Sequence, residues 1–175
     1  MIYLCACEEP ELGTYYFETD QDGVALRQIV IEEDGSRVTS HRKHELYHFM
    51  LAEHPIDLSD PSYERIPKAR FEELWSEVLL ATMEEWRQIK QALPIGQKVA
   101  GSIEAFFPQG TLVDLFEHRA VGLADTAFLK QHSPREWMYP GYKLTASVKG
   151  YDEINQWVLL DQTRMLDGER RVVER

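Results

Sequence analysis

The stretch 96-GQKVAGSIEAFFPQGTLVDLFEHRAVGLADTAFL-129 decides the fold of this chain. It consists of short runs of β-forming residues that glycines and polar turns separate, and it ends in a short helical run. With 139-YPGYKLTASVKGYDEINQWVLLD-161 it provides five strand-length runs, and the helical insert lies between the third and the fourth. That number and order of elements predicts a small β-barrel of the OB type.

The first half of the chain predicts a different architecture. Residues 14–42 alternate strand-like runs with turn signals at Asp22-Gly23 and Asp34-Gly35, which indicates an antiparallel meander. Residues 53–67 contain three prolines and two clusters of Ser and Asp, so we expect a loop there, with one helical turn at most.

Residues 68–93 predict one long amphipathic helix between Pro67 and Pro94. Its apolar residues follow the helical period and form one stripe: Phe71, Leu74, Trp75, Val78, Leu79, Met83, Trp86, Ile89 and Leu93. We interpret this stripe as a core face. The predicted fold is therefore α+β in two domains. Residues 1–93 form the meander with its long helix, and residues 94–175 form a five-stranded OB-type barrel with a C-terminal tail.

Charge is distributed unevenly along the chain, whose net charge is −11. Residues 1–95 hold 9 Lys and Arg against 19 Asp and Glu, and residues 96–175 hold 10 against 11. The acidic first half repels polyphosphates and suits a basic protein partner or simply solubility. The near-neutral second half neither favours nor excludes nucleic acid as a ligand.

Hydropathy and cysteine usage predict a cytoplasmic location. No apolar run approaches the roughly 18 residues of a membrane span, and the N-terminus is a poor match to a signal peptide, so we expect no membrane partner. Cys5 and Cys7 share one face of an expected strand. Neighbours at this spacing seldom form a disulfide, and two thiolates do not complete a zinc site, so we expect reduced, buried cysteines.

Residues 94–163 resemble the RNA-binding OB domain first described in ribosomal small-subunit protein one, called here the S-one-type domain. The matched positions are turn glycines, barrel-facing apolar residues and one aspartate: Gly101, Ile103, Phe106, Gly110, Val113, Leu115, Gly122, Leu123, Gly141, Leu144, Val148, Asp152, Val158 and Leu160. The resemblance implies a barrel, and it implies single-stranded RNA or the ribosome as the partner. The first ninety or so residues are not covered.

The family's RNA face consists of two aromatics, a histidine, an aspartate and an arginine, because rings stack on bases and cations bind phosphate. In the same order, this chain has Gln109, Leu112, Asp125, Asp152 and Trp157. Only the aspartate is kept. Other residues of the barrel are candidate substitutes, either as stacking rings or as phosphate contacts: Phe107, Trp157, His118, Arg119, Lys143 and Lys149. In the alternative interpretation the two rings are packing residues and the charges are ordinary surface.

The segment 44-HELYH-48 matches the zinc-hydrolase motif H-E-x-x-H. On a helix, His44 and His48 would be ligands and Glu45 the general base, with Glu72, Glu73 or Glu77 as third ligand. The preceding Arg42 and Lys43 and the nearby Pro55 argue against that arrangement. The alternatives are a short helix with His41, His44 and His48 on one face, or a non-catalytic metal site. We expect no cofactor and no bound metal.

The function predicted from the sequence is that of a non-enzymatic binding protein, a divergent RNA- or ribosome-associated S-one-type module. One alternative is an acidic protein-interaction protein, of the adaptor or immunity kind, that binds its partner through the N-terminal half. A second alternative is a small zinc hydrolase that uses 44-HELYH-48.

Overall fold

The computed structural model describes residues 1–6 and 13–170. The chain divides into two compact units, residues 1–82, called the sheet unit, and residues 83–175, called the barrel unit. The fold is mixed α+β, as predicted, with a closed five-stranded barrel and a separate antiparallel sheet. The division lies between Thr82 and Met83, whereas the sequence predicts a boundary after Leu93.

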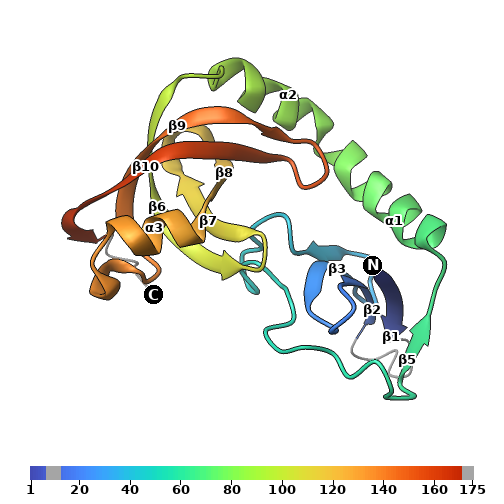
Figure 1. The fold of residues 1–175 in the computed structure, drawn as a ribbon. Coiled ribbons are helices and arrows are strands. Elements are labelled where there is room, and N and C mark those ends of the chain that lie inside the picture. The colour runs from blue at the N-terminus through green and yellow to red at the C-terminus, as the bar shows by residue number, and fades with distance from the viewer. Residues whose placement is uncertain (7–12, 171–175) are drawn as a thin grey trace. The chain divides into compact units, whose positions relative to one another are not determined.

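The sheet unit contains a five-stranded antiparallel sheet with the order β4-β3-β2-β1-β5 (Figure 1). The strands are β1 (Ile2–Ala6), β2 (Thr14–Thr19), β3 (Ala25–Ile31), β4 (Arg37–Thr39) and β5 (Tyr63–Arg65). Strands β2 to β4 are the predicted meander, and Gly23 and Gly35 have the positive φ angles that their turns require. Strand β5 lies within the segment that was predicted to be a loop.

Both faces of the sheet are covered by apolar residues. Because side chains alternate along a strand, Tyr3 and Leu4 of β1 point to opposite faces. Tyr3 packs with Ile29 and with Phe71, Leu74 and Trp75 of α1 (Lys68–Ala81). Leu4 packs instead with Phe17, Ala25 and Ile56, so the loop after β4 covers the second face.

The prediction of one long helix is wrong, because the chain forms two helices, α1 and α2 (Met83–Ala92), with a break at Thr82. Thr82 has φ −115° and ψ 6°, and its hydroxyl donates to the Leu79 carbonyl at 3.2 Å. A β-branched residue that bonds the preceding turn in this way competes with helix continuation. The predicted apolar stripe is divided between two cores, since Trp75 is buried in the sheet unit and Trp86 in the barrel unit. Met83, between them, is exposed.

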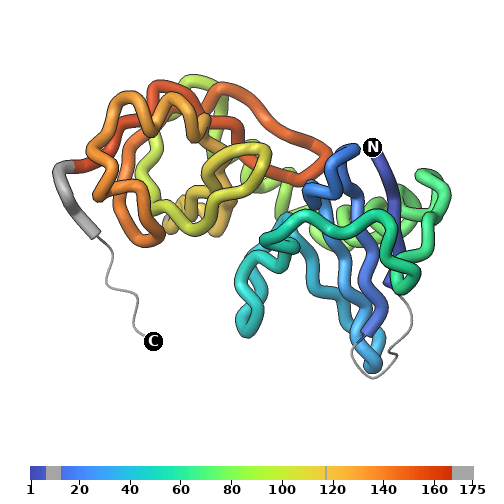
Figure 2. Tube along the Cα trace, turned by 60° about the horizontal axis from the view of Figure 1, so that its bottom comes forward, coloured from blue at the N-terminus to red at the C-terminus, as the bar shows by residue number. Residues whose placement is uncertain are grey.

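The barrel unit closes with the strand order β10-β8-β7-β6-β9. Its strands are β6 (Lys98–Phe107), β7 (Gly110–Leu115), β8 (Ala120–Ala124), β9 (Tyr142–Asp152) and β10 (Trp157–Arg170). Figure 2 shows these strands as a closed ring. Among the described strands of this unit only the β8–β10 pair is parallel, and α3 (Thr126–His132) lies between β8 and β9. The unit also contains the 3-10 helices Phe116–His118 and Arg135–Trp137. This arrangement is compatible with an OB-type barrel.

The barrel interior is apolar. Inward residues from all five strands, among them Ile103, Val113, Leu144 and Val158, form one cluster with Trp86 and Ile89 of α2. Burial of this surface is the main favourable term in folding of the unit. Helix α2 is therefore part of the barrel unit, which explains why the division of the chain precedes it.

Two further sequence predictions concern the membrane and the cysteines. Among the residues that the structure describes, no helix is both long enough and apolar enough to cross a membrane. Cys5 is 3% exposed in β1, as expected, but it is disulfide-bonded, which contradicts the predicted reduced thiol. Cys7 lies outside the described residues. The cytoplasmic location stays a prediction.

Candidate nucleic-acid interface

An open pocket of about 550 Å³ lies on the barrel at the turn between β6 and β7. Its walls are the turn itself (107–110), the end of β8 with the first residues of α3 (123–127), and Lys149, Leu159 and Leu160 of β9 and β10. Ligand pockets of about 300–1,000 Å³ are typical of small-molecule and cofactor sites. The pocket is therefore large enough for a nucleotide-sized group.

A single glycine allows two walls of this pocket to meet. Gly110 has φ +155°, and a Cβ atom on it would lie 2.6 Å from the carbonyl oxygen of Ala124. Only glycine permits this approach of β7 to the end of β8. The hydroxyls of Thr111 and Thr126, 2.8 Å apart, connect the same two segments.

Among the lining side chains, Lys149 and Asp125 carry opposite charges. The Lys149 side chain is exposed. Asp125 is the N-cap of α3, and its Oδ1 accepts hydrogen bonds from the amides of Ala127 at 2.8 Å and Phe128 at 3.0 Å. The apolar part is supplied by Leu123, Leu159 and Leu160. The lining of the pocket thus combines apolar side chains with one exposed cation, Lys149, and with a carboxylate, Asp125, that the amides of α3 hold in place.

Three of the residues predicted for an RNA face line this pocket together with Lys149, namely Phe107, Gln109 and Asp125. Phe107 is half-buried, and its ring packs edge-on against Trp157 with centroids 6.1 Å apart. Gln109 is exposed at the tip of the turn. The aromatic ring and the amide are therefore placed beside Lys149 by one tight turn.

Two predicted interface residues are excluded by burial. Leu112 is 0% exposed and Trp157 is 1% exposed, so neither side chain has surface with which to stack on a base. Leu112 stands at an aromatic position of the family's RNA face and Trp157 at its arginine position, and both are packing residues here. Within the pair Phe107 and Trp157, the packing interpretation is therefore correct for Trp157.

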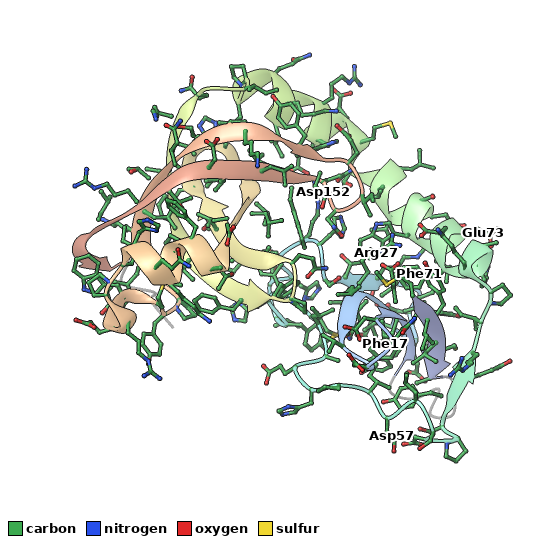
Figure 3. The ribbon with its side chains drawn as sticks, in the orientation of Figure 1. Phe17, Arg27, Asp57, Phe71, Glu73 and Asp152 are labelled. Atoms are coloured by element: carbon green, nitrogen blue, oxygen red, sulfur yellow. The ribbon has the colours of Figure 1, made fainter. Side chains whose placement is uncertain are left out.

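Asp152 keeps the family's residue but serves the turn between β9 and β10. Its Oδ1 accepts from the amides of Ile154 at 2.8 Å and Asn155 at 3.2 Å, and its Oδ2 accepts from the Asn155 side chain at 2.8 Å. Figure 3 labels Asp152 at this end of the two strands. We assign it a structural role.

The remaining predicted cations lie outside the pocket. His118 ends the 3-10 helix after β7, and Arg119 follows it in the left-handed conformation with φ 50°. Lys143 is half-buried at the start of β9. None of the three lines the pocket, so the structure does not gather the predicted phosphate contacts into one strip. Sequence reasoning missed Thr126, whose only signal is its place directly after the N-cap aspartate.

The segment 44-HELYH-48 is not a helix, which contradicts both helical interpretations of it. His44 and His48 instead form a backbone bridge, in which the N···O distances are 2.7 Å and 3.0 Å, and His48 has φ 52°. His44 Nδ1 accepts from the Leu46 amide at 3.2 Å. Within residues 1–6 and 13–170, no group of three His, Cys, Asp or Glu is placed to hold a metal ion.

Comparison with known proteins identifies no relative: no family model, no curated protein and no solved structure matches the chain.

Proposed function

We propose that the barrel unit is a divergent S-one-type OB domain that binds single-stranded RNA, free or within the ribosome, at the β6–β7 pocket. The observation that carries the proposal is the coincidence of Phe107, Gln109 and Lys149 in one pocket of a barrel with this strand order. A ring, an amide and a cation are the groups that single-stranded nucleic acid requires.

Each of these side chains has a distinct task in the proposal. The half-buried ring of Phe107 contacts a base, Gln109 hydrogen-bonds to a base edge, and Lys149 binds a phosphate. The carboxylate of Asp125 repels phosphate, so the backbone of the RNA must pass on the Lys149 side. One ring provides about 1–3 kcal/mol for one base, which favours weak, micromolar binding.

Fluorescence anisotropy of a labelled, mixed-sequence single-stranded RNA tests this proposal with the full chain. Each phosphate contact on a single strand contributes about −0.7 to the slope of log K against log salt. With one lysine in the pocket, we expect affinity to fall only about threefold between about 50 and 200 mM salt. Absence of binding at the lower salt concentration would overturn the proposal.

Two substitutions locate the binding. Phe107→Leu keeps apolar packing against Trp157 but removes the ring, and should weaken binding at least about fivefold. Lys149→Gln should weaken it about three- to tenfold and flatten the salt dependence. Lys130→Gln is the matched control, because Lys130 is exposed on α3 and does not line the pocket. Equal losses in Lys149→Gln and Lys130→Gln would place the RNA elsewhere.

A further inference from the structure

Asp125 is the only carboxylate among the described residues that line the β6–β7 pocket, and it is exposed. A negative charge is unfavourable beside the phosphates of RNA, so its presence in this pocket needs a reason. Its Oδ1 accepts both hydrogen bonds from the amides of Ala127 and Phe128. Among the residues that the structure describes, Oδ2 has no hydrogen-bond partner. Oδ2 is therefore an open acceptor, and the cap of α3 holds it in place.

The strand pairing places this carboxylate across a glycine from the ring of Phe107. Phe107 of β6 pairs with Gly110 of β7, and Thr111 of β7 pairs with Ala124 of β8. Asp125 directly follows Ala124, so the same register places it beside Gly110. Neighbouring strands lie about 4.8 Å apart, so two spacings, roughly 10 Å, separate the backbones at Phe107 and Asp125. Gly110 puts no side chain between them, so the edge of a base in contact with Phe107 can reach Oδ2.

A β-bulge presents Lys149 to the same pocket. Leu159 pairs with Gly150 and Leu160 with Val148, so Lys149 is the extra residue of β9 between two paired positions. Bulges of this kind change the direction of a side chain and are common beside functional sites. The bulge therefore accounts for a cation in the lining, where the proposed function assigns it to a phosphate.

An ionised carboxylate only accepts hydrogen bonds, which divides the bases of RNA into two classes. Cytosine, adenine and guanine each have an exocyclic amino group that donates. Uracil has a carbonyl oxygen, O4, where cytosine has its amino group, and its N3–H donor lies between two carbonyl oxygens. Contact with Oδ2 is thus favourable for an amino group and repulsive for O4.

We propose that Asp125 makes this site selective for bases with an exocyclic amino group and against uracil. The inference rests on the proposed RNA binding and adds the class of base that the pocket accepts. A nucleotide with its phosphate at Lys149 and its base against Phe107 donates from the amino group to Oδ2. The carboxylate weakens the attraction for phosphate, and in return it discriminates between bases.

Fluorescence anisotropy of the full chain with labelled oligocytidylate and oligouridylate of equal length tests this selectivity at neutral pH. Both probes are single-stranded pyrimidine chains with equal numbers of phosphates, so the ratio of their affinities reports on the base edge. We expect oligocytidylate to bind about three- to tenfold more tightly. Equal binding, or a preference for oligouridylate, would overturn the inference and leave the proposed RNA binding in place. If mixed-sequence RNA also fails to bind, the proposed function fails with it.

Asp125→Asn separates recognition of the base from general repulsion of RNA. Asparagine is as good an N-cap as aspartate, so α3 stays capped, and an amide nitrogen that donates takes the place of Oδ2. Loss of the negative charge should tighten binding of both probes. Because O4 of uracil gains a donor, the ratio of the two affinities should fall to about one or below. If Asp125 only repelled phosphate, both affinities would rise by the same factor and the ratio would stay, which would overturn the inference.

Two further variants serve as controls. Glu136→Gln removes an exposed carboxylate of the barrel unit that does not line the pocket, so it should leave the ratio unchanged. Lys149→Gln should weaken binding of both probes equally, because the phosphate is common to them. A fall in the ratio in either variant as large as that in Asp125→Asn would overturn the inference.

Discussion

The two units use the same chemical arrangement to attach a helix to strands: a cation lies over two aromatic rings and pairs with glutamate. In the sheet unit, the guanidinium of Arg27 lies 5.0 Å from the ring centroid of Phe71 and 5.1 Å from that of Trp75. Figure 3 labels Arg27 and Phe71 between the sheet and α1. In the barrel unit, the ammonium of Lys90 lies 5.4 Å from the centroid of Trp86 and 5.9 Å from that of Tyr151.

The two arrangements differ in burial. The Arg27 side chain is 6% exposed and contacts Glu18 at 2.5 Å and Glu72 at 2.6 Å. Lys90 is 32% exposed, and its partner Glu153, at 2.8 Å, is 60% exposed. Water replaces a lost partner at an exposed pair but not at a buried one. The same chemistry should therefore dominate the stability of one unit and matter little in the other.

Burial also determines the balance of the pKa shifts. Desolvation acts against the charged forms of Glu18 and Arg27, but their hydrogen bonds outweigh it. As a result the pKa of Glu18 is lowered and that of Arg27 is raised. The Tyr3 hydroxyl also donates to Glu18, at 3.0 Å. The network is stable because every charge in it has a partner.

The largest expected effect follows from removing Arg27. Arg27→Met leaves Glu18 buried without its cation, and should lower the free energy of unfolding of the sheet unit by about 3–5 kcal/mol. Urea unfolding, monitored through hydrogen exchange of the β3 amides, would measure the loss. The double variant Arg27→Met/Glu18→Gln should recover part of it, because no buried charge is then unpaired. A double variant that is less stable than the single one would contradict this explanation.

Acidification should also affect the sheet unit more than the barrel unit. In the unfolded chain His41 takes up a proton below the ordinary histidine pKa of 6.5, whereas in the folded protein it does so only near 3. The stabilising contribution is therefore present above pH 6.5 and is lost as the pH falls, by about 1.4 kcal/mol per pH unit, or about 2 kcal/mol by about pH 5.

Unit-resolved hydrogen exchange at about pH 7 and 5 would measure this dependence. The lowered pKa of Glu18 adds to the loss only below its unfolded value, near pH 4.5. His41→Phe is the control: it should flatten the pH dependence of the sheet unit between about pH 6.5 and 5, whatever its effect on stability at neutral pH. An unchanged slope in that variant would show that another group is responsible.

An exchange of the two cations should have unequal effects. Arg27 donates from Nε to Glu18 and from both terminal nitrogens to Glu72, a fork that lysine does not reproduce. Arg27→Lys should therefore lower the stability of the sheet unit by about 1.5 kcal/mol. Lys90→Arg should change that of the barrel unit by less than about 0.5 kcal/mol. Equal effects in urea unfolding would refute the role given to burial.

The smallest expected effect belongs to the exposed pair. Glu153 accepts from the Trp86 indole at 2.7 Å as well as from Lys90. In Glu153→Gln an oxygen remains to accept from the indole, and only the exposed charge is lost, so stability should fall by less than about 1 kcal/mol. A loss as large as that of Arg27→Met would mean that exposure is a poor guide to the energy of such pairs in this protein.

Patterns local in sequence predicted much of the fold. Alternation and Asp-Gly turns located β2 and β3, and the spacing of glycines and apolar runs located the barrel strands. The failures occur where a residue's partner is distant. Trp75 and Trp86 fit one helical period but belong to different cores. The spacing of the apolar residues continues across Thr82, so it does not predict the break there. Strand β5 forms because β1 pairs with it, with Cys5 opposite Glu64, rather than by its own composition.

The candidate interface was predictable only in part, for a related reason. A resemblance transfers positions along the chain, but burial depends on neighbours. Phe107 and Gln109 lie in a turn, where their exposure follows from local geometry. Leu112 lies in β7 with β6 on one side and β8 on the other, and its burial depends on both.

Closure of the barrel has a further consequence for self-association. A closed ring presents no strand edge, whereas the open sheet ends at β4 and β5. Edges are where a sheet can recruit a strand from another molecule and grow into an aggregate. Here both edge strands are three residues long, and they carry Arg37 on one side and Glu64 and Arg65 on the other. Short, charged edges offer a poor template for intermolecular pairing, so they protect the open sheet against aggregation.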